Sequence, residues 1–80
     1  MTLTQELLRF VREELAGGSP VIDENEPLID GGLIDSMGLM QLITFIEDRT
    51  GVRVPDDEVV PDNFQTVTSI DQLVQRLKAR

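Results

Sequence analysis

The amino-acid sequence predicts an all-α protein, a small four-helix bundle with three main helices, a short third helix and a long first loop. Apolar residues recur at spacings of three, four and seven in three separate stretches, which is the pattern of amphipathic helices. Gly and Pro residues separate these stretches. Only residues 52–54 alternate between apolar and polar side chains as a strand does. Three residues are too few for a stable strand, and no second strand is available to pair with them. A length of 80 residues predicts one domain, residues 1–80.

The first helix is expected over residues 2–16. Its apolar stripe consists of Leu3, Leu7, Leu8, Val11 and Leu15. Thr2 and Gln5 have the spacing of a capping box, in which each side chain bonds to the other residue's backbone, and Thr4 is the alternative cap. Two glycines at 17–18 are expected to end the helix, because Gly adopts the left-handed conformation of a helix C-terminus most easily.

A long loop is expected over residues 19–34, where two prolines and two glycines oppose regular structure. Its apolar residues come in pairs, which predicts a loop fixed to the core: Val21, Ile22, Leu28, Ile29, Leu33 and Ile34. The acidic run at 23–26 has some likeness to a calcium-binding loop. That interpretation fails because Ile34 occupies the position of the bidentate Glu, so no metal site is predicted.

The second helix is expected over residues 36–50 and is expected to end at Gly51. Its apolar face holds Leu39, Leu42, Ile43 and Ile46, with Phe45 beside it. Counted in helical steps, the face on the side of Ser36 holds Met37, Met40, Gln41, Thr44 and Glu47. The two methionines are either core filler or an adaptable contact surface for several partners. The second interpretation is favoured because Leu and Ile already fill the core stripe.

The C-terminal part is expected to contain an extended connector at 52–54, helical structure within 56–65 and a last helix. Pro61 limits the length of any helix in 56–65, and Phe64 is expected to fill the core. Thr68 and Asp71 have capping-box spacing, which predicts that Thr68 opens the last helix. The apolar stripe of that helix is Ile70, Leu73, Val74 and Leu77.

Composition narrows the possible functions. The chain has no Cys and no His, so it cannot build a Ser-His-Asp triad, a thiolate metal site or a thiol nucleophile of its own, and we expect no enzyme activity. The formal net charge of -8 makes nucleic acid and anionic membranes poor partners. A basic patch on another protein suits such a surface, although acidity can serve solubility alone. No signal peptide or membrane span is recognisable, so the cytoplasm is the expected location.

Ser36 stands directly before the apolar run of the second helix. A serine in that place is usually an N-cap, worth about 1 kcal/mol. The same place also suits a phosphate ester, which the helix N-terminus favours by roughly 0.3–1 kcal/mol. Asp35 beside it either assists an incoming enzyme, by holding a divalent cation, or is a second capping residue. The residues alone leave both alternatives open.

The chain resembles acyl and peptidyl carrier proteins over nearly its whole length, from about Leu3 to Leu77. The resemblance rests on the Asp-Ser-Met entry at 35–37, the helix that ends in Glu-Asp-Arg-Thr-Gly at 47–51, the acidic segment after it and the Ile-Asp-Gln-Leu-Val run at 70–74. It implies an acyl-carrier-protein-like bundle in which Ser36 matches the attachment serine. A separate phosphopantetheinyl transferase would place the 4'-phosphopantetheine arm of coenzyme A on this residue.

The resemblance also implies what the arm and its surroundings do. The thiol of the arm would carry acyl or aminoacyl groups as thioesters, so this thiol is supplied by the cofactor. Asp35 matches the acid that adjoins the site and contributes to recognition by the transferase. The face holding Met37, Met40, Gln41, Thr44 and Glu47 matches the surface that carriers offer to partner enzymes. A monomer that takes no part in catalysis is expected.

Two departures from the family pattern concern the pathway. Carriers of primary fatty-acid synthesis usually have Gly three residues before the serine, where this chain has Leu33, and an acid where Gln41 stands. The form found here looks more like free-standing carriers of natural-product pathways (polyketide or nonribosomal peptide type), which an AMP-forming ligase loads and condensing or tailoring enzymes use. The alternative is an unmodified acidic interaction module that binds a partner through Met37 and Met40.

Overall fold

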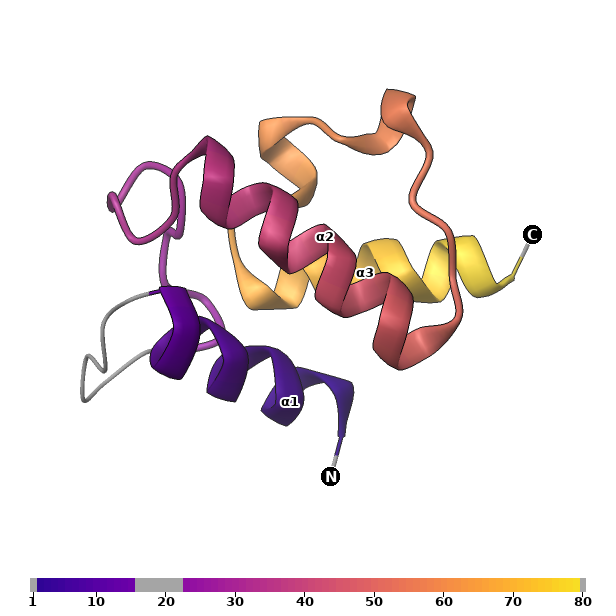
Figure 1. Cartoon of the computed structure of the whole chain (residues 1–80), viewed down its shortest axis with the longest axis horizontal. Helices are drawn as coiled ribbons and strands as arrows, with labels where there is room; N and C mark the ends of the chain where they lie inside the picture. The colour runs from indigo at the N-terminus through magenta and orange to yellow at the C-terminus, as the bar shows by residue number, and fades with distance from the viewer. Residues whose placement is uncertain (1, 16–22, 80) are drawn as a thin grey trace.

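The computed structural model describes residues 2–15 and 23–79, and every regular element in these ranges is helical, as predicted. The elements in chain order are α1 (Leu3–Phe10), the π-helical segment η1 (Val11–Leu15), α2 (Ser36–Thr50), the 3-10 turns η2 (Asp56–Glu58) and η3 (Pro61–Asn63), and α3 (Val67–Lys78). Figure 1 shows α2 across the middle of the molecule with α1 along one side and α3 behind it. In the described ranges no helix is both long and apolar enough to cross a membrane.

The core draws on all the helices longer than a single turn and on the segments that connect them. Phe64 is its largest fully buried side chain, which confirms the predicted core position. The remaining buried side chains are aliphatic: Leu7, Val11, Leu28, Ile34, Leu42, Ile43, Ile46, Val54, Val67, Ile70, Leu73 and Val74. Because each of α1, α2 and α3 packs apolar side chains into this cluster, the apolar stripes predicted from the sequence are confirmed as the packing faces of the three main helices, apart from Leu15, whose side chain lies outside the described part of the structure.

The start of α1 agrees with the sequence and its end does not. Thr2 and Gln5 form the predicted capping box. A regular α-helix through residue 16 was the wrong prediction, because the α-helix stops at Phe10 and the chain continues as a π-helix over Val11–Leu15. The apolar spacing does not distinguish the two forms, since Val11 is buried in the π-helical segment as well. The predicted stop at 17–18 lies outside the described residues.

α2 has the predicted bounds and is held against α1 by two contacts. It begins at Ser36 and ends at Thr50, followed by Gly51 in the left-handed conformation with a φ of 70°. Phe45 stacks on Phe10 of α1 with the ring centroids 4.3 Å apart. Arg49 forms an ion pair with Glu6 of α1. Phe45 therefore lies at the seam between the two helices, beside the core stripe as predicted.

The described part of the long loop is fixed to the core, as predicted for Leu28 and Ile34, which are both buried. The backbone N–H of Leu28 donates to the carbonyl of Gln65 at 2.7 Å, while the N–H groups of Leu33 and Ile34 both donate to the carbonyl of Leu28. Gly31 is required at the tightest point, because a Cβ there would lie 2.2 Å from the carbonyl oxygen of Pro27. Val21 and Ile22 lie outside the described residues.

In the C-terminal half, the predicted connector and short helical structure are confirmed, and the predicted start of the last helix is wrong. The connector at 52–54 is extended, and the helical structure expected within 56–65 takes the form of the two 3-10 turns η2 and η3. The predicted cap of the last helix was wrong, because Thr66 is the N-cap and bonds to the backbone N–H of Ser69. The Thr68 hydroxyl instead bonds to the long loop, at the carbonyl of Glu24.

Candidate functional site

Ser36 is the first residue of α2 and its side chain is exposed. The interpretation of Ser36 as the helix cap was wrong, because Asp35 is the N-cap and its Oδ1 accepts a 2.8 Å hydrogen bond from the backbone N–H of Gly38. The Ser36 hydroxyl makes no hydrogen bond to the described residues. This hydroxyl is therefore open to solvent at the start of α2 and has no hydrogen-bond partner among the described residues.

The backbone around Ser36 suits a phosphate ester. The N–H of Leu39 donates to the carbonyl of Asp35, so helical bonding begins there. The N–H groups of Ser36 and Met37 precede that bond and have no acceptor within the helix. Together with the dipole of a 15-residue helix they favour an anion beside the serine. The residues present thus fit the phosphate end of an arm attached to Ser36 Oγ.

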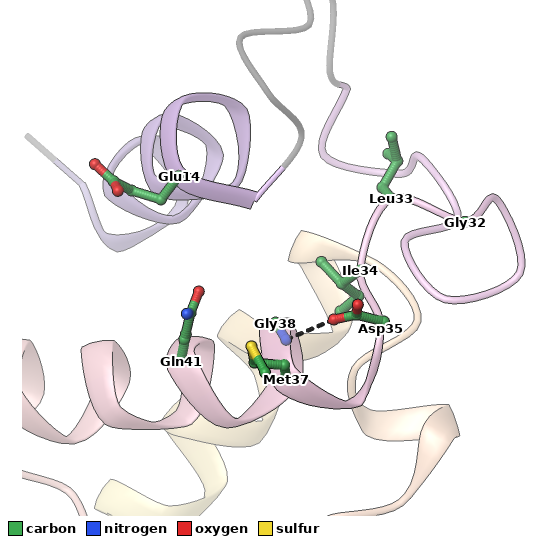
Figure 2. Close-up of a pocket in the computed structure, with 8 residues that line it drawn as sticks. All are labelled: Glu14, Gly32, Leu33, Ile34, Asp35, Met37, Gly38 and Gln41. Carbon is green, nitrogen blue, oxygen red and sulfur yellow. Dashed lines mark hydrogen bonds between the residues drawn. The ribbon is translucent and has the colours of Figure 1, made fainter.

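A cleft of about 270 Å³ adjoins Ser36, between η1, the end of the long loop and the first turns of α2. Figure 2 shows the eight residues that line it and the bond from Gly38 to Asp35. Among them, the side chain of Gln41 rises from α2 toward the segment that carries Glu14. The full lining is Glu14, Gly32, Leu33, Ile34, Asp35, Met37, Gly38 and Gln41.

The five residues of the predicted partner face differ in their surroundings. Met37 and Met40 are 71% and 60% exposed, which rules out their use as core filler. Gln41 and Thr44 are exposed next to them. Glu47 is half-buried, and its Oε2 accepts a 2.9 Å hydrogen bond from the backbone N–H of Val54. Four of the five side chains are thus open to a partner, while that of Glu47 fixes the connector after α2.

The contribution of α1 and η1 to this region was missed at the level of sequence. Phe10 and Glu14 face α2 across a second cleft of about 460 Å³, which Met37, Met40, Gln41 and Thr44 complete. A helical periodicity identifies which residues share a face of one helix, but it does not show which residues of another helix lie opposite. In the described ranges no group of three or more acidic side chains could hold a metal ion.

The comparison with protein families decides the identity. The family model described as "Phosphopantetheine attachment site" matches residues 5–77. The chain belongs to this family of carrier proteins. Its resemblance to acyl and peptidyl carriers is thereby confirmed, and with it the carrier function: such a protein holds acyl groups as thioesters on covalently attached 4'-phosphopantetheine and is acted on by partner enzymes rather than being a catalyst.

Individual relatives agree. The carrier is 37% identical over 65 residues to the probable acyl carrier protein PigG of Serratia sp. (strain ATCC 39006). The aligned region covers 81% of this chain and 75% of the relative. It is 39% identical over 54 residues to D-alanyl carrier proteins of Streptococcus pyogenes, covering 68% of each chain. A chain from the solved structure described as "Crystal structure of FAD-dependent dehydrogenase" superposes with a TM-score of 0.80 at 30% identity, over 86% of this chain and 99% of that one.

Proposed function

We propose that Ser36 carries the 4'-phosphopantetheine arm. The observation that supports this most directly is an exposed hydroxyl, without a hydrogen bond to the described residues, at the first residue of α2. The other serine in the described ranges, Ser69, is half-buried and its hydroxyl lies 2.9 Å from that of Thr66. Ser69 is therefore engaged in capping α3, and Ser36 is the better nucleophile by position.

In the attachment step Ser36 Oγ forms a bond to the phosphorus of coenzyme A that is nearest the pantetheine. The anhydride bond to the second phosphorus breaks, adenosine 3',5'-bisphosphate leaves, and the hydroxyl proton passes to a base of the transferase. Asp35 holds the first turn of α2 through Gly38 and keeps Ser36 at its start. When bound, the arm supplies the thiol that holds the cargo as a thioester.

The surface formed by Met37, Met40, Gln41 and Thr44 is proposed to receive partner enzymes. Exposed methionines adapt to differently shaped surfaces, which suits a carrier that visits several enzymes in turn. The net charge of -8 attracts basic patches and speeds encounter without requiring tight binding. Glu47 contributes indirectly, because its side chain accepts a hydrogen bond from the backbone of Val54 and so fixes the connector after α2.

The proposed setting is a cytoplasmic natural-product pathway, in which an AMP-forming ligase loads the holo carrier and condensing or tailoring enzymes use the cargo. The likeness to the probable acyl carrier protein PigG supports a free-standing carrier, and the likeness to D-alanyl carrier proteins supports an amino-acid cargo. The likeness to a chain from the FAD-dependent dehydrogenase structure makes a flavin-dependent dehydrogenase a candidate tailoring partner.

The attachment is tested by intact-mass measurement. The apo protein is incubated with coenzyme A and a phosphopantetheinyl transferase of broad specificity. We expect a gain of one phosphopantetheine unit in the wild-type protein and in Ser69→Ala, and no gain in Ser36→Ala. A gain that persists in Ser36→Ala, or no gain in the wild-type protein, would overturn the proposal.

The alternative predicted from the sequence, an unmodified interaction module, rests on the exposure of Met37 and Met40, which a carrier that visits several enzymes explains equally well. It predicts that Ser36→Ala leaves partner binding and pathway output intact while Met40→Glu abolishes both. The carrier proposal predicts that Ser36→Ala abolishes output without weakening the binding of partners to the helix surface. Measuring output and binding for the two variants side by side distinguishes the two functions.

A further inference from the structure

A groove runs between α1–η1 and the first half of α2. It comprises the two clefts described above, which adjoin because they share Glu14, Met37 and Gln41. One end opens at Asp35 and Met37, the two neighbours of Ser36, and the other end lies between Phe10 and Thr44. The groove therefore shares Met37, Met40, Gln41 and Thr44 with the surface proposed to receive partner enzymes, and adds Phe10 and Glu14 to it.

An arm on Ser36 reaches this groove without any change in the fold. Met40 and Thr44 lie roughly 6 and 12 Å along the axis of α2 from Ser36, at 1.5 Å per residue. A phosphopantetheine arm has two amide units and is about as long as four or five extended residues, or roughly 13–18 Å. The end of the arm, and the group it carries, can therefore lie beside Phe10 or Glu14.

The groove is preformed on its α1 side. The stacked rings of Phe10 and Phe45 and the ion pair between Glu6 and Arg49 hold α1 against α2 beside the groove. Glu14 projects from η1, and π-helical turns of this kind are often found at functional sites. A ligand in the groove would thus meet walls that are already in place, which lowers the entropy cost of binding.

The chemistry of the groove indicates the kind of cargo. Phe10, Met37 and Met40 offer apolar surface, while Glu14 and Gln41 offer a carboxylate and an amide. Glu14 has no ion-pair partner within residues 2–15 and 23–79, and the sequence of residues 16–22 contains no Lys or Arg. An exposed carboxylate at the edge of an apolar groove is complementary to an ammonium group attached to a small apolar body.

We propose that this groove is the resting site for an aminoacyl cargo tethered to Ser36. The α-ammonium group of the cargo pairs with Glu14 and donates a hydrogen bond to the Gln41 side-chain oxygen, while its apolar part lies against Phe10 and Met40. This inference rests on the proposed attachment at Ser36. It gives the amino-acid cargo proposed above a binding site on the carrier, and assigns Phe10 and Glu14 a role in holding the cargo between visits to partner enzymes.

The test uses two stable amide analogues of coenzyme A, one alanyl and one propionyl, which differ only in the ammonium group. Each is attached to the 13C,15N-labelled carrier by the transferase, and intact mass verifies the loading before NMR spectra are compared with those of the holo form. We expect the alanyl group to shift the Glu14 carboxylate carbon and the signals of Phe10 and Gln41. The propionyl group is expected to shift Phe10 but leave the Glu14 carboxylate unchanged.

Glu14→Gln removes the charge at an exposed position and keeps the size of the side chain. We expect it to reduce the alanyl-specific shifts at Phe10 and Gln41 by more than half, without changing those of the propionyl form. Glu13→Gln, which alters the neighbouring exposed carboxylate of η1, is the matched control and should change neither set.

Three outcomes are informative. A mass gain on Ser36 with alanyl and holo spectra that agree at Phe10, Glu14 and Gln41 overturns the resting site and leaves the attachment intact. Shifts that are equal for both analogues, or that persist in Glu14→Gln, overturn the assigned role of the carboxylate. No mass gain overturns the attachment itself and the resting site with it.

Discussion

Replacing Asp35 tests whether the first turn of α2 depends on this residue, as the geometry indicates. Asp35→Ala removes the one side-chain bond that caps the helix, from the Gly38 N–H to Oδ1 at 2.8 Å. It also removes a negative charge at the positive end of the helix dipole. Loss of an N-cap costs about 1 kcal/mol, within a range of roughly 0.5–2 kcal/mol. Because this is an appreciable part of the stability of a small domain, the effect is measurable.

Asp35→Asn is the matched variant, since its side-chain oxygen still accepts the bond from Gly38 while the charge is lost. Thermal unfolding of the apo proteins, followed by circular dichroism, compares the two. We expect the alanine variant to melt about 4–8 °C below the wild-type protein per kcal/mol lost, and the asparagine variant to lose less than half as much. Equal melting temperatures for the wild-type and alanine proteins would refute the capping role.

Comparing Asp35→Ala with Asp35→Asn also distinguishes an effect of Asp35 on helix stability from an effect on recognition by the transferase. If Asp35 acts on modification only by holding the helix start, the asparagine variant is converted to the holo form at the wild-type rate. If its charge helps the transferase to bind or to hold a divalent cation, conversion slows while the melting temperature stays high. The measurement is the initial rate at which each protein gains the mass of the arm at a fixed coenzyme A concentration.

Three further predictions concern stability and are measured by urea unfolding. Phe64→Ala removes the largest fully buried side chain and is expected to cost about 3–5 kcal/mol, a large part of the stability of a small domain; a loss below about 1 kcal/mol would contradict its core position. Gly31→Ala is expected to destabilise the protein, because the new methyl group would lie 2.2 Å from the backbone carbonyl of Pro27; wild-type stability would contradict this. Ser36→Ala is expected to stay within about 0.5 kcal/mol of the wild-type protein, because that hydroxyl bonds to no described residue and the cap is Asp35; a larger loss would mean that Ser36 has a structural role.

The three main helices could be predicted because each buries one apolar stripe and two of their ends carry local signals that the structure confirms. The capping box at Thr2 and Gln5 and the glycine after Thr50 are local features, and local features can be read from the order of residues. The start of α3 could not be chosen in the same way. Thr66 and Thr68 both precede a polar residue by three positions, and the choice between them depends on a tertiary bond from Thr68 to Glu24.

The position of the candidate site was predictable, but part of its local function was not. Asp35 and Ser36 are both good capping residues and adjacent, so the sequence alone does not say which one caps α2. In the structure Asp35 caps it, and the serine hydroxyl has no hydrogen bond within the described ranges 2–15 and 23–79. The groove residues Phe10 and Glu14 could not be found at all, because their approach to α2 is a matter of packing between helices.

The fold gives a structural reason for the positions of the two loop glycines, Gly31 and Gly32. Primary fatty-acid carriers usually have Gly where this chain has Leu33, and the position of the glycines at 31 and 32 instead contributed to the natural-product proposal. Gly31 is needed where the chain passes the carbonyl of Pro27, and Gly32 adopts a φ of 74° in the same turn. Their placement is thus explained by the turn at 27–34, and the pathway proposal depends more on Gln41 and on the relatives than on these glycines.

The central claim is that Ser36 bears the arm, and peptide mapping of the holo protein tests it most directly. The protein is modified with coenzyme A and a transferase, cleaved by a protease, and each fragment is sequenced by tandem mass spectrometry. We expect one phosphopantetheine unit per chain, located on Ser36 of the fragment that spans the start of α2. A unit located on Ser69 or on a threonine, or spread over several hydroxyl groups, would contradict it.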